Sequence, residues 1–229
     1  MSAKSMLERY QELRHRRISM IELLVTLVLL MIVTPFLENF RFGSIIEVIL
    51  LTLVLIMAVV AVGASSRMQT LATLLAIPAV AGKWISHFRP DLVPVEVSLV
   101  ADMLFVGFVV VNLLRFTLTA PRVDVEVLSA AISNFLMIGL FWVLAYDLAA
   151  RMVPNSFAFS TGPAAAHTMS GFNGFYFSFV TLSTIGYGDI TPLSPVARML
   201  AIVEAIVGMF YMTVLVARLV AMYSSGRSE

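Results

Sequence analysis

Six long apolar runs dominate this sequence and decide what the chain can fold into. Hydrophobic residues make up 60% of the 229 positions and charged residues only 13%, a balance far from that of a soluble domain. A hydrocarbon core about 30 Å thick is crossed by roughly 20 apolar residues of helix. The sequence therefore predicts an all-α membrane protein with six transmembrane helices. The predicted spans lie near 19–37, 44–63, 68–85, 95–114, 127–150 and 194–222.

The third run is the weakest of the predicted spans. It is short, contains Pro78 and ends in Lys83 and Trp84, a pair typical of a membrane interface or of a segment that does not cross. With six spans and both termini in the cytoplasm, ten of the fifteen Lys and Arg residues fall on the cytoplasmic side, in line with the positive-inside rule. If the third run did not span, the basic N-terminal segment would change sides, which the same rule disfavours.

A different kind of sequence separates the fifth and sixth runs. A stretch rich in Pro, Gly and Ala, 154–166, is followed by an aromatic segment, 172–182, that is too short to cross a membrane. Such segments often enter and leave on one side, as re-entrant helices. The predicted domains are a cytoplasmic N-terminal segment (1–17), a four-helix peripheral domain (18–115), an interfacial linker (116–126), a two-helix domain around the re-entrant segment (127–222) and a C-terminal tail (223–229).

The aromatic segment leads into Thr184-Ile185-Gly186-Tyr187-Gly188-Asp189. A dehydrated cation in a membrane needs its water shell replaced by oxygens, and a loop from each of several subunits can supply rings of backbone carbonyls. The carbonyls can face one axis only where some residues take positive φ, which glycine does at little steric cost. Ile185 and Tyr187 would then pack away from the axis, and the Thr184 hydroxyl would add the innermost ring. The segment therefore has the pattern of a cation-coordinating filter.

The aromatic segment itself would hold this filter in place. Four aromatic side chains between 175 and 179 suit a short helix whose rings pack against neighbours, and Tyr187 can pack and hydrogen-bond among them. Such a helix would end near Ser183 with the negative end of its dipole toward the ions. Asp189 would attract cations at the outer mouth.

The stretch from Thr184 to Asp189 resembles the signature of the potassium channel superfamily, and residues 127–222 resemble its pore module. The resemblance implies a bacterial six-transmembrane subunit with a single pore loop, whose pore module is similar to that of the small two-helix bacterial potassium channels. We expect a homotetramer among the lipids of the bacterial inner (plasma) membrane, with K+ as the permeant ion and no cofactor. K+ would bind to carbonyls of Thr184, Ile185, Gly186 and Tyr187, and Gly188 with Asp189 would shape the outer entrance.

The resemblance also extends by position into the last span. Gly208 matches the hinge glycine at which the inner helix of the small bacterial channels bends, and the residues that would then face the cavity below the filter are Met209, Met212 and Val216. Val180 stands where the two-helix bacterial channels have a glutamate behind the filter, as in many voltage-gated relatives. The filter inactivation of those channels is therefore not carried over to this chain.

Two carboxyl groups lie inside predicted spans, where ionisable groups are costly. Asp102, near the middle of the fourth span, has two open roles: a carboxyl hydrogen-bonded to a neighbouring helix, or a pH-responsive gating group. Glu204 lies one helical turn before Gly208 on roughly the same face. It would either hydrogen-bond to the scaffold of the filter or tune cavity ions electrostatically.

Steep voltage gating is not expected. A charge that crosses 100 mV gains only about 2.3 kcal/mol, so voltage sensors need several Arg or Lys residues at three-residue spacing. The fourth run, 95–114, contains none, and Arg115 follows directly after it. The sequence therefore predicts passive K+ conduction with weak or absent intrinsic voltage gating.

The sequence bears on several other functions as well. A weakly selective cation channel usually lacks the tyrosine or the following glycine of the filter, and a potassium transporter carries four unlike pore loops in one chain, whereas this chain has one intact loop. A non-conducting regulatory channel subunit stays open as an alternative. The net charge of +1 does not favour a nucleic-acid partner, and no catalytic constellation is evident.

Overall fold

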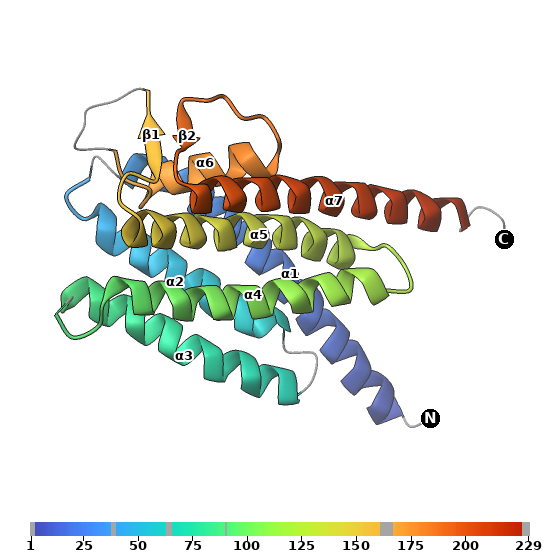
Figure 1. Ribbon diagram of the computed structural model, residues 1–229. Helices are drawn as coiled ribbons and strands as arrows, with labels where there is room; N and C mark the ends of the chain where they lie inside the picture. The colour runs from blue at the N-terminus through green and yellow to red at the C-terminus, as the bar shows by residue number, and fades with distance from the viewer. Residues whose placement is uncertain (1–2, 38–39, 63–65, 90, 161–166, 226–229) are drawn as a thin grey trace.

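The computed structural model describes residues 3–37, 40–62, 66–89, 91–160 and 167–225. Within them the chain forms seven helices and two short strands (Figure 1). Residues 1–2 of the predicted N-terminal segment and 226–229 of the predicted tail lie outside the described residues. The elements are α1 (Ala3–Leu37), α2 (Gly43–Val62), α3 (Ser66–Phe88), α4 (Val95–Thr119), α5 (Val125–Met152), β1 (Phe157–Phe159), α6 (Phe172–Leu182), β2 (Ile190–Pro192) and α7 (Pro195–Ser225).

Six of these helices are long and apolar enough to cross a membrane. The prediction of an all-α protein with six spans is therefore confirmed, and only α6 is too short. The third candidate span, on α3, has 22 residues because the helix continues past Trp84, whose Nε1 donates to Thr52 Oγ1 of α2 at 3.0 Å. The candidate spans are Ser19–Leu37, Gly43–Val62, Arg67–Phe88, Val95–Thr119, Val125–Met152 and Pro195–Arg218.

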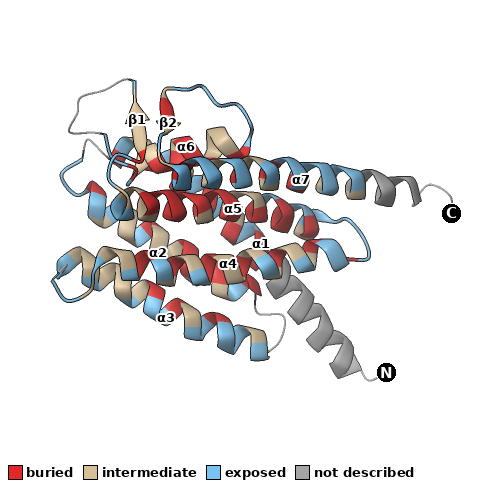
Figure 2. Ribbon diagram, in the orientation of Figure 1, coloured by how far each residue is buried: buried red, intermediate tan, exposed pale blue. Residues whose placement is uncertain are grey.

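Helix α5 is the central element of the fold. It begins after Asp124, whose side chain accepts a hydrogen bond from the amide of Val127 at 2.9 Å and so caps the helix. It packs against α1 and α4 on one side and against α6 and α7 on the other (Figure 1). Of its candidate span 72% is buried, and Figure 2 shows α5 as a band of buried residues. α5 therefore joins the four-helix domain to the site-bearing elements.

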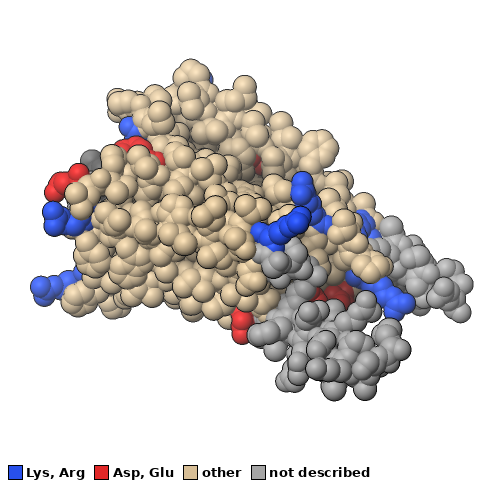
Figure 3. Space-filling view, turned by 90° about the horizontal axis from the view of Figure 1, so that it is seen from below, with Lys and Arg blue, Asp and Glu red and all other residues tan. Residues whose placement is uncertain are grey.

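Helix α7 is the opposite case, because only 17% of its candidate span is buried. Large apolar side chains such as Ile202, Ile206 and Phe210 are exposed along it, and Figure 2 shows the exposed residues running along the helix. The exposed apolar face of α7 suits contact with lipid tails or with further protein chains. Figure 3 shows the molecule from below, on the side across from α7, where few charged side chains interrupt a surface of uncharged residues.

The four-helix domain is joined to α5 by a short link. α4 ends at Thr119 and α5 begins at Val125, which leaves the five residues 120–124 between two helices that pack side by side. Arg218 of α7 donates from Nη2 to the carbonyl oxygen of Ala120 in this link at 2.7 Å. The four-helix domain therefore packs on the α5 of its own chain, and the far end of α7 is fastened to the link.

The strands β1 and β2 form an antiparallel pair that the sequence did not predict. Phe157 pairs with Pro192 and Phe159 with Ile190. A three-residue strand is too short to show an alternating pattern, and its partner lies some thirty positions further along the chain. The pair closes the segment that contains α6 and the candidate filter, so that this segment leaves and returns at the same end of the molecule (Figure 1).

Candidate functional site

The candidate filter lies in an exposed loop, residues 183–188, that follows α6. The amide groups of three consecutive loop residues donate back to the last turn of α6. They are Thr184 (to Thr181 O, 2.9 Å) and Ile185 and Gly186 (both to Val180 O, at 2.9 and 3.3 Å). In a trans peptide the C=O points opposite to the N–H of the same unit, and the described backbone contains no cis peptide bond. The carbonyl oxygens of residues 183–185 therefore point away from α6, toward the open face.

Every second residue of the loop has a positive φ: 59° at Thr184, 57° at Gly186 and 82° at Gly188. The positive φ predicted for the two glycines is confirmed. When left- and right-handed backbone conformations alternate, successive peptide groups point toward the same side. In a β-strand, by contrast, successive peptide groups point to opposite sides. Thr184 was not predicted in this conformation, because a residue with a β-carbon is disfavoured there by roughly 1–2 kcal/mol. The hydrogen bond from its backbone amide to the carbonyl oxygen of Thr181 in α6 helps to hold Thr184 in this conformation.

The outer end of the loop is anchored through Asp189. The Tyr176 hydroxyl of α6 donates to Asp189 Oδ2 at 2.6 Å, and the Asp189 carbonyl accepts from the backbone amide of Ser160 at 2.8 Å. The ring of Tyr187 stacks on that of Tyr176 at 6.4 Å with an interplanar angle of 9°. The hydrogen bond to Asp189, aided by burial, raises the pKa of Tyr176 to about 12. The phenol therefore stays protonated, and able to donate, to a higher pH than an ordinary tyrosine.

Two glycines let the neighbouring helices approach α6 closely. A β-carbon on Gly208 of α7 would lie 2.1 Å from the carbonyl oxygen of Leu182, and one on Gly139 of α5 would lie 2.5 Å from the ring of Phe179. Both distances are far below van der Waals contact. An interior helix glycine costs about 1 kcal/mol relative to alanine, so its presence in a predicted span was a usable signal of close packing. From the sequence, only Gly208 was singled out among the glycines of the spans, and it was interpreted as a hinge and not as a packing contact.

Behind α6, Glu204 of α7 accepts hydrogen bonds from two other helices. Ser178 of α6 shares its hydroxyl hydrogen between Glu204 Oε1 (2.6 Å) and the carbonyl oxygen of Gly139 (2.9 Å). The Tyr146 hydroxyl of α5 donates to Glu204 Oε2. Glu204, Tyr146 and Ser178 are all fully buried. The carboxyl thus links the three helices α5, α6 and α7, and nothing in the sequence identified Tyr146 or Ser178 as its partners.

The remaining predicted residues lie elsewhere. Asp102 of α4 forms an ion pair with Lys83 of α3, with 2.8 Å between Oδ2 and Nζ. It lies within the four-helix domain, and its Oδ1 has no hydrogen-bond partner in the described part of the chain. Met209, Met212 and Val216 are exposed along α7. The structure therefore brings Glu204 and Gly208 to the filter segment and leaves Asp102 away from it.

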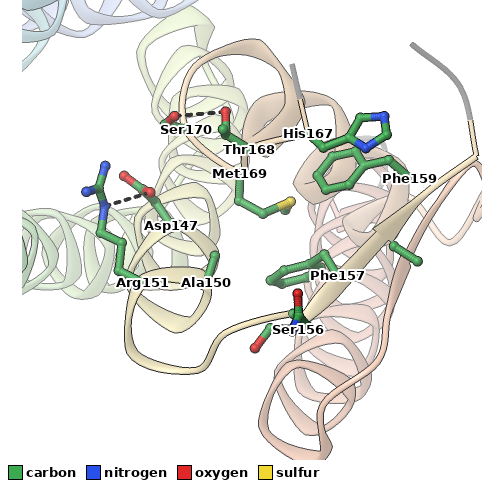
Figure 4. A pocket seen from close by; sticks show the side chains of 12 residues that line it. Asp147, Ala150, Arg151, Ser156, Phe157, Phe159, His167, Thr168, Met169 and Ser170 are labelled. Carbon is green, nitrogen blue, oxygen red and sulfur yellow. Dashed lines mark hydrogen bonds and ion pairs between the residues drawn. The ribbon is translucent and has the colours of Figure 1, made fainter. Parts of the chain in front are cut away.

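A groove of about 600 Å³ opens beside β1, at the end of the molecule that carries Asp189. Figure 4 shows the ring of His167 lying over that of Phe159, with 4.9 Å between the ring centroids. On the opposite wall Arg151 Nε donates to Asp147 Oδ1 at 3.0 Å. The groove is lined by residues of α5, β1 and the segment before α6, and by none of the filter loop.

Comparison with known sequences finds ion channels. A sequence model of the ion channel family matches residues 135–225, which include most of α5 and the whole of α6, the filter loop and α7. Over 69 residues, 30% of the chain, the sequence is 38% identical to two pore potassium channel c of Oryza sativa subsp. japonica. Over 49 residues, 21% of the chain, it is 43% identical to two-pore potassium channel 3 of Arabidopsis thaliana.

These matches cover 14% and 11% of the length of the two plant proteins. No solved structure matches the chain. The chain is thus a six-span membrane protein that carries an ion channel module. The predicted resemblance to the potassium channel superfamily is supported by these matches, which concern this part of the chain only.

Proposed function

We propose that this chain is one subunit of a homotetrameric channel that conducts K+ passively through the loop 184–188. The observation that carries the proposal is the alternation of φ in this loop, together with amide groups that bond back to α6. Four copies around an axis would present stacked rings of carbonyl oxygens from Thr184, Ile185, Gly186 and Tyr187. Such rings replace the hydration shell of a monovalent cation.

The surface of the single chain supports assembly around the filter. Ile185 is 55% and Tyr187 69% exposed, although both are large apolar or aromatic side chains of an otherwise anchored loop. In a tetramer the neighbouring copy would cover them, and the exposed face of α7 would meet further copies. The C-terminal end of each α6 would point its negative dipole end toward the axis. Gly188 and Asp189 would shape the outer entrance.

Conduction would be controlled at α7. Gly208 would be the point where α7 bends, and Met209, Met212 and Val216 would line the cavity below the filter. The four-helix domain offers little for voltage gating, because α4 has a single basic residue, Arg115, near its C-terminal end. Its other charged residues are acidic: Glu96 in the first turn, and Asp102, which is already paired with Lys83. We infer K+ conduction without steep intrinsic voltage gating. The filter would face outward and both termini inward across a plasma membrane.

Reconstitution of the purified chain in planar bilayers tests the proposal. In a gradient of K+ against Na+, the reversal potential should lie near that of K+. A reversal potential near zero would favour the weakly selective cation channel, and absence of current from intact protein would favour the regulatory subunit. Gly186→Ala, at a residue with a φ of 57°, should abolish selective current. Gly107→Ala, whose β-carbon would meet nothing closer than 3.6 Å, is the matched control.

A further inference from the structure

Three polar side chains of α7, those of Glu204, Tyr211 and Arg218, are spaced seven residues apart. Seven residues make about two turns of helix, so the three lie on nearly the same face. Glu204 bonds to α5 and α6, Tyr211 to α5, and Arg218 to the link between α4 and α5. Gly208 lies between the first contact and the second. The half of α7 after Gly208 therefore has hydrogen-bonded contacts of its own, separate from the contact behind the filter segment.

The contact of Tyr211 is buried between α7 and α5. The residue is 8% exposed, and its hydroxyl donates to the carbonyl oxygen of Ala131 at 2.6 Å. Its ring packs against that of Phe135, with 5.9 Å between the centroids. Within an α-helix the Ala131 carbonyl already accepts from the amide four residues further on, so it needs no second donor. The hydroxyl therefore stabilises the described position of α7 on α5, although the helix α5 does not require the bond.

Asn134, one helical turn beyond Ala131 on α5, has the opposite effect on this contact. Its side chain is fully buried and lies close to the Tyr211 hydroxyl. Neither the nitrogen nor the oxygen of its amide has a hydrogen-bond partner in the part of the chain that the structure describes. A buried amide without partners is costly, and the cost falls if α7 moves aside and water reaches the group. Asn134 therefore disfavours the position of α7 that Tyr211 favours.

We propose that Tyr211 and Asn134 are opposing positioning residues between α5 and α7, and that together they set how often the half of α7 after Gly208 leaves α5. One net hydrogen bond shifts an equilibrium about two- to tenfold, and one unsatisfied buried group shifts it about fivefold or more. The two effects are similar in size and opposite in sign, so the position of α7 is close to balance.

This inference rests on the proposed function, in which α7 controls conduction, and it adds the residues that set the equilibrium. Bending of α7 at Gly208 would break the bond between Tyr211 and Ala131 and would expose the amide of Asn134. The contacts of Glu204 lie before the glycine and would stay in place. The filter segment would therefore keep its support on α5 and α7 while the other end of α7 moves.

Distances between two spin labels on one chain test this equilibrium without any current. The chain contains no cysteine, so the labels can be attached through Leu128→Cys on α5 and Ala217→Cys on α7, both at exposed positions. Labelled chains are diluted with an excess of unlabelled chain in vesicles, and the distances are measured by pulsed electron paramagnetic resonance. The distribution gives the ratio of displaced α7 to α7 in the described position.

Three variants of the labelled chain complete this test. Tyr211→Phe, which removes one hydroxyl and keeps the ring beside Phe135, should raise the ratio about two- to tenfold, and adding Asn134→Leu should lower it again by about fivefold or more. Thr213→Val is the matched control and should leave the ratio unchanged, because that hydroxyl bonds to the carbonyl oxygen of Met209 in α7 itself at 2.8 Å. An unchanged ratio in Tyr211→Phe, or a ratio that Asn134→Leu does not lower, would overturn the proposal.

Single-channel recordings connect the same two residues to conduction. Tyr211→Phe and Asn134→Leu, recorded separately, should shift the open probability in opposite directions and leave the reversal potential unchanged. A merely structural role would change the melting temperature without opposite shifts of this kind. Shifts in the same direction would overturn the link to conduction. A chain that carries no K+ current would instead contradict the proposed function, and the spin-label distances would still decide between the two positions of α7.

Discussion

Gly208 of α7 lies so close to Leu182 that a β-carbon on the glycine would sit 2.1 Å from the leucine carbonyl oxygen. Leu182 is the last residue of α6, directly before the candidate filter. The glycine therefore fixes how near α7 can come to the base of the filter, in addition to any role as a hinge. Because the backbone atoms of Leu182 cannot rotate away as a side chain can, a β-carbon at position 208 would clash with them.

Gly208→Ala should destabilise the protein for this reason. The expected cost is about 1–3 kcal/mol, as for other overpacked sites, and thermal melting of the solubilised protein followed by circular dichroism measures it. Gly107→Ala is the matched control, because its β-carbon finds ordinary van der Waals space. The control should be neutral or stabilising by roughly 0.5–1 kcal/mol. Equal melting temperatures for the two variants would contradict the packing role of Gly208.

Glu204→Ala should disrupt the contact of α6 with α5 and α7. The substitution leaves the Tyr146 hydroxyl without its acceptor in a buried site, and that of Ser178 with only the Gly139 carbonyl, and each buried unsatisfied group costs about 1–3 kcal/mol. We expect loss of the assembled oligomer, measured by size-exclusion chromatography with light scattering. Ser170→Ala, which removes an exposed hydroxyl contact with Thr168, should leave assembly unchanged. An intact oligomer with altered conductance would instead favour electrostatic tuning of cavity ions.

Tyr176→Phe should loosen the outer end of the filter loop. The variant loses the hydrogen bond to Asp189 but keeps the ring that stacks on Tyr187. We expect shorter conducting bursts in single-channel recordings at low K+, with an unchanged melting temperature. Bursts of wild-type length in the variant would show that the bond to Asp189 does not hold the loop.

The same bond predicts how the wild-type protein responds to pH. Because the pKa of Tyr176 is raised to about 12, above the ordinary value near 10, the stabilisation from its hydrogen bond is fully present below pH 10. It is lost only as pH rises through about 12. Burst length should therefore be constant between pH 7 and pH 9.5 as far as this group is concerned. A shortening that appears in wild type and not in Tyr176→Phe within this range would contradict the assignment.

Asp102→Asn should destabilise the four-helix domain. It leaves Lys83 without its partner in a largely buried position, which typically costs 3–5 kcal/mol, so we expect a loss of about this size. The more exposed pair of Asp147 and Arg151 is the control, and Asp147→Asn should cost at most about 1 kcal/mol. Thermal melting compares the two variants. Replacing both partners, by Lys83→Met with Asp102→Leu, should recover most of the loss.

Recordings of Asp102→Asn across pH separate the two roles that the sequence left open for this carboxyl. A purely structural ion pair predicts a pH response like that of wild type in the protein that remains folded. A flattened response would instead identify Asp102 as a pH-sensing group.

The sequence alone determined the six spans, the short helix Phe172–Leu182 and the positive φ of Gly186 and Gly188. These features follow from local causes: the length of apolar runs against the thickness of a bilayer, and the steric limits of each residue's own backbone. Local causes did not predict the positive φ of Thr184, because this conformation is helped by the hydrogen bond from its amide to α6. The three-residue strands were missed because their pairing joins distant parts of the chain.

Only the tertiary structure decided which side chains meet. From the sequence, two carboxyl groups were predicted inside spans, but their partners were not. The packing of the helices places Glu204 in hydrogen-bonding contact with Tyr146 and Ser178. It places Asp102 in an ion pair with Lys83. It also set the approach of Gly208 to Leu182. Hydropathy says that a residue is buried, whereas its partner depends on the rotation and depth of a second helix. Those two quantities are fixed by the packing of all the helices together.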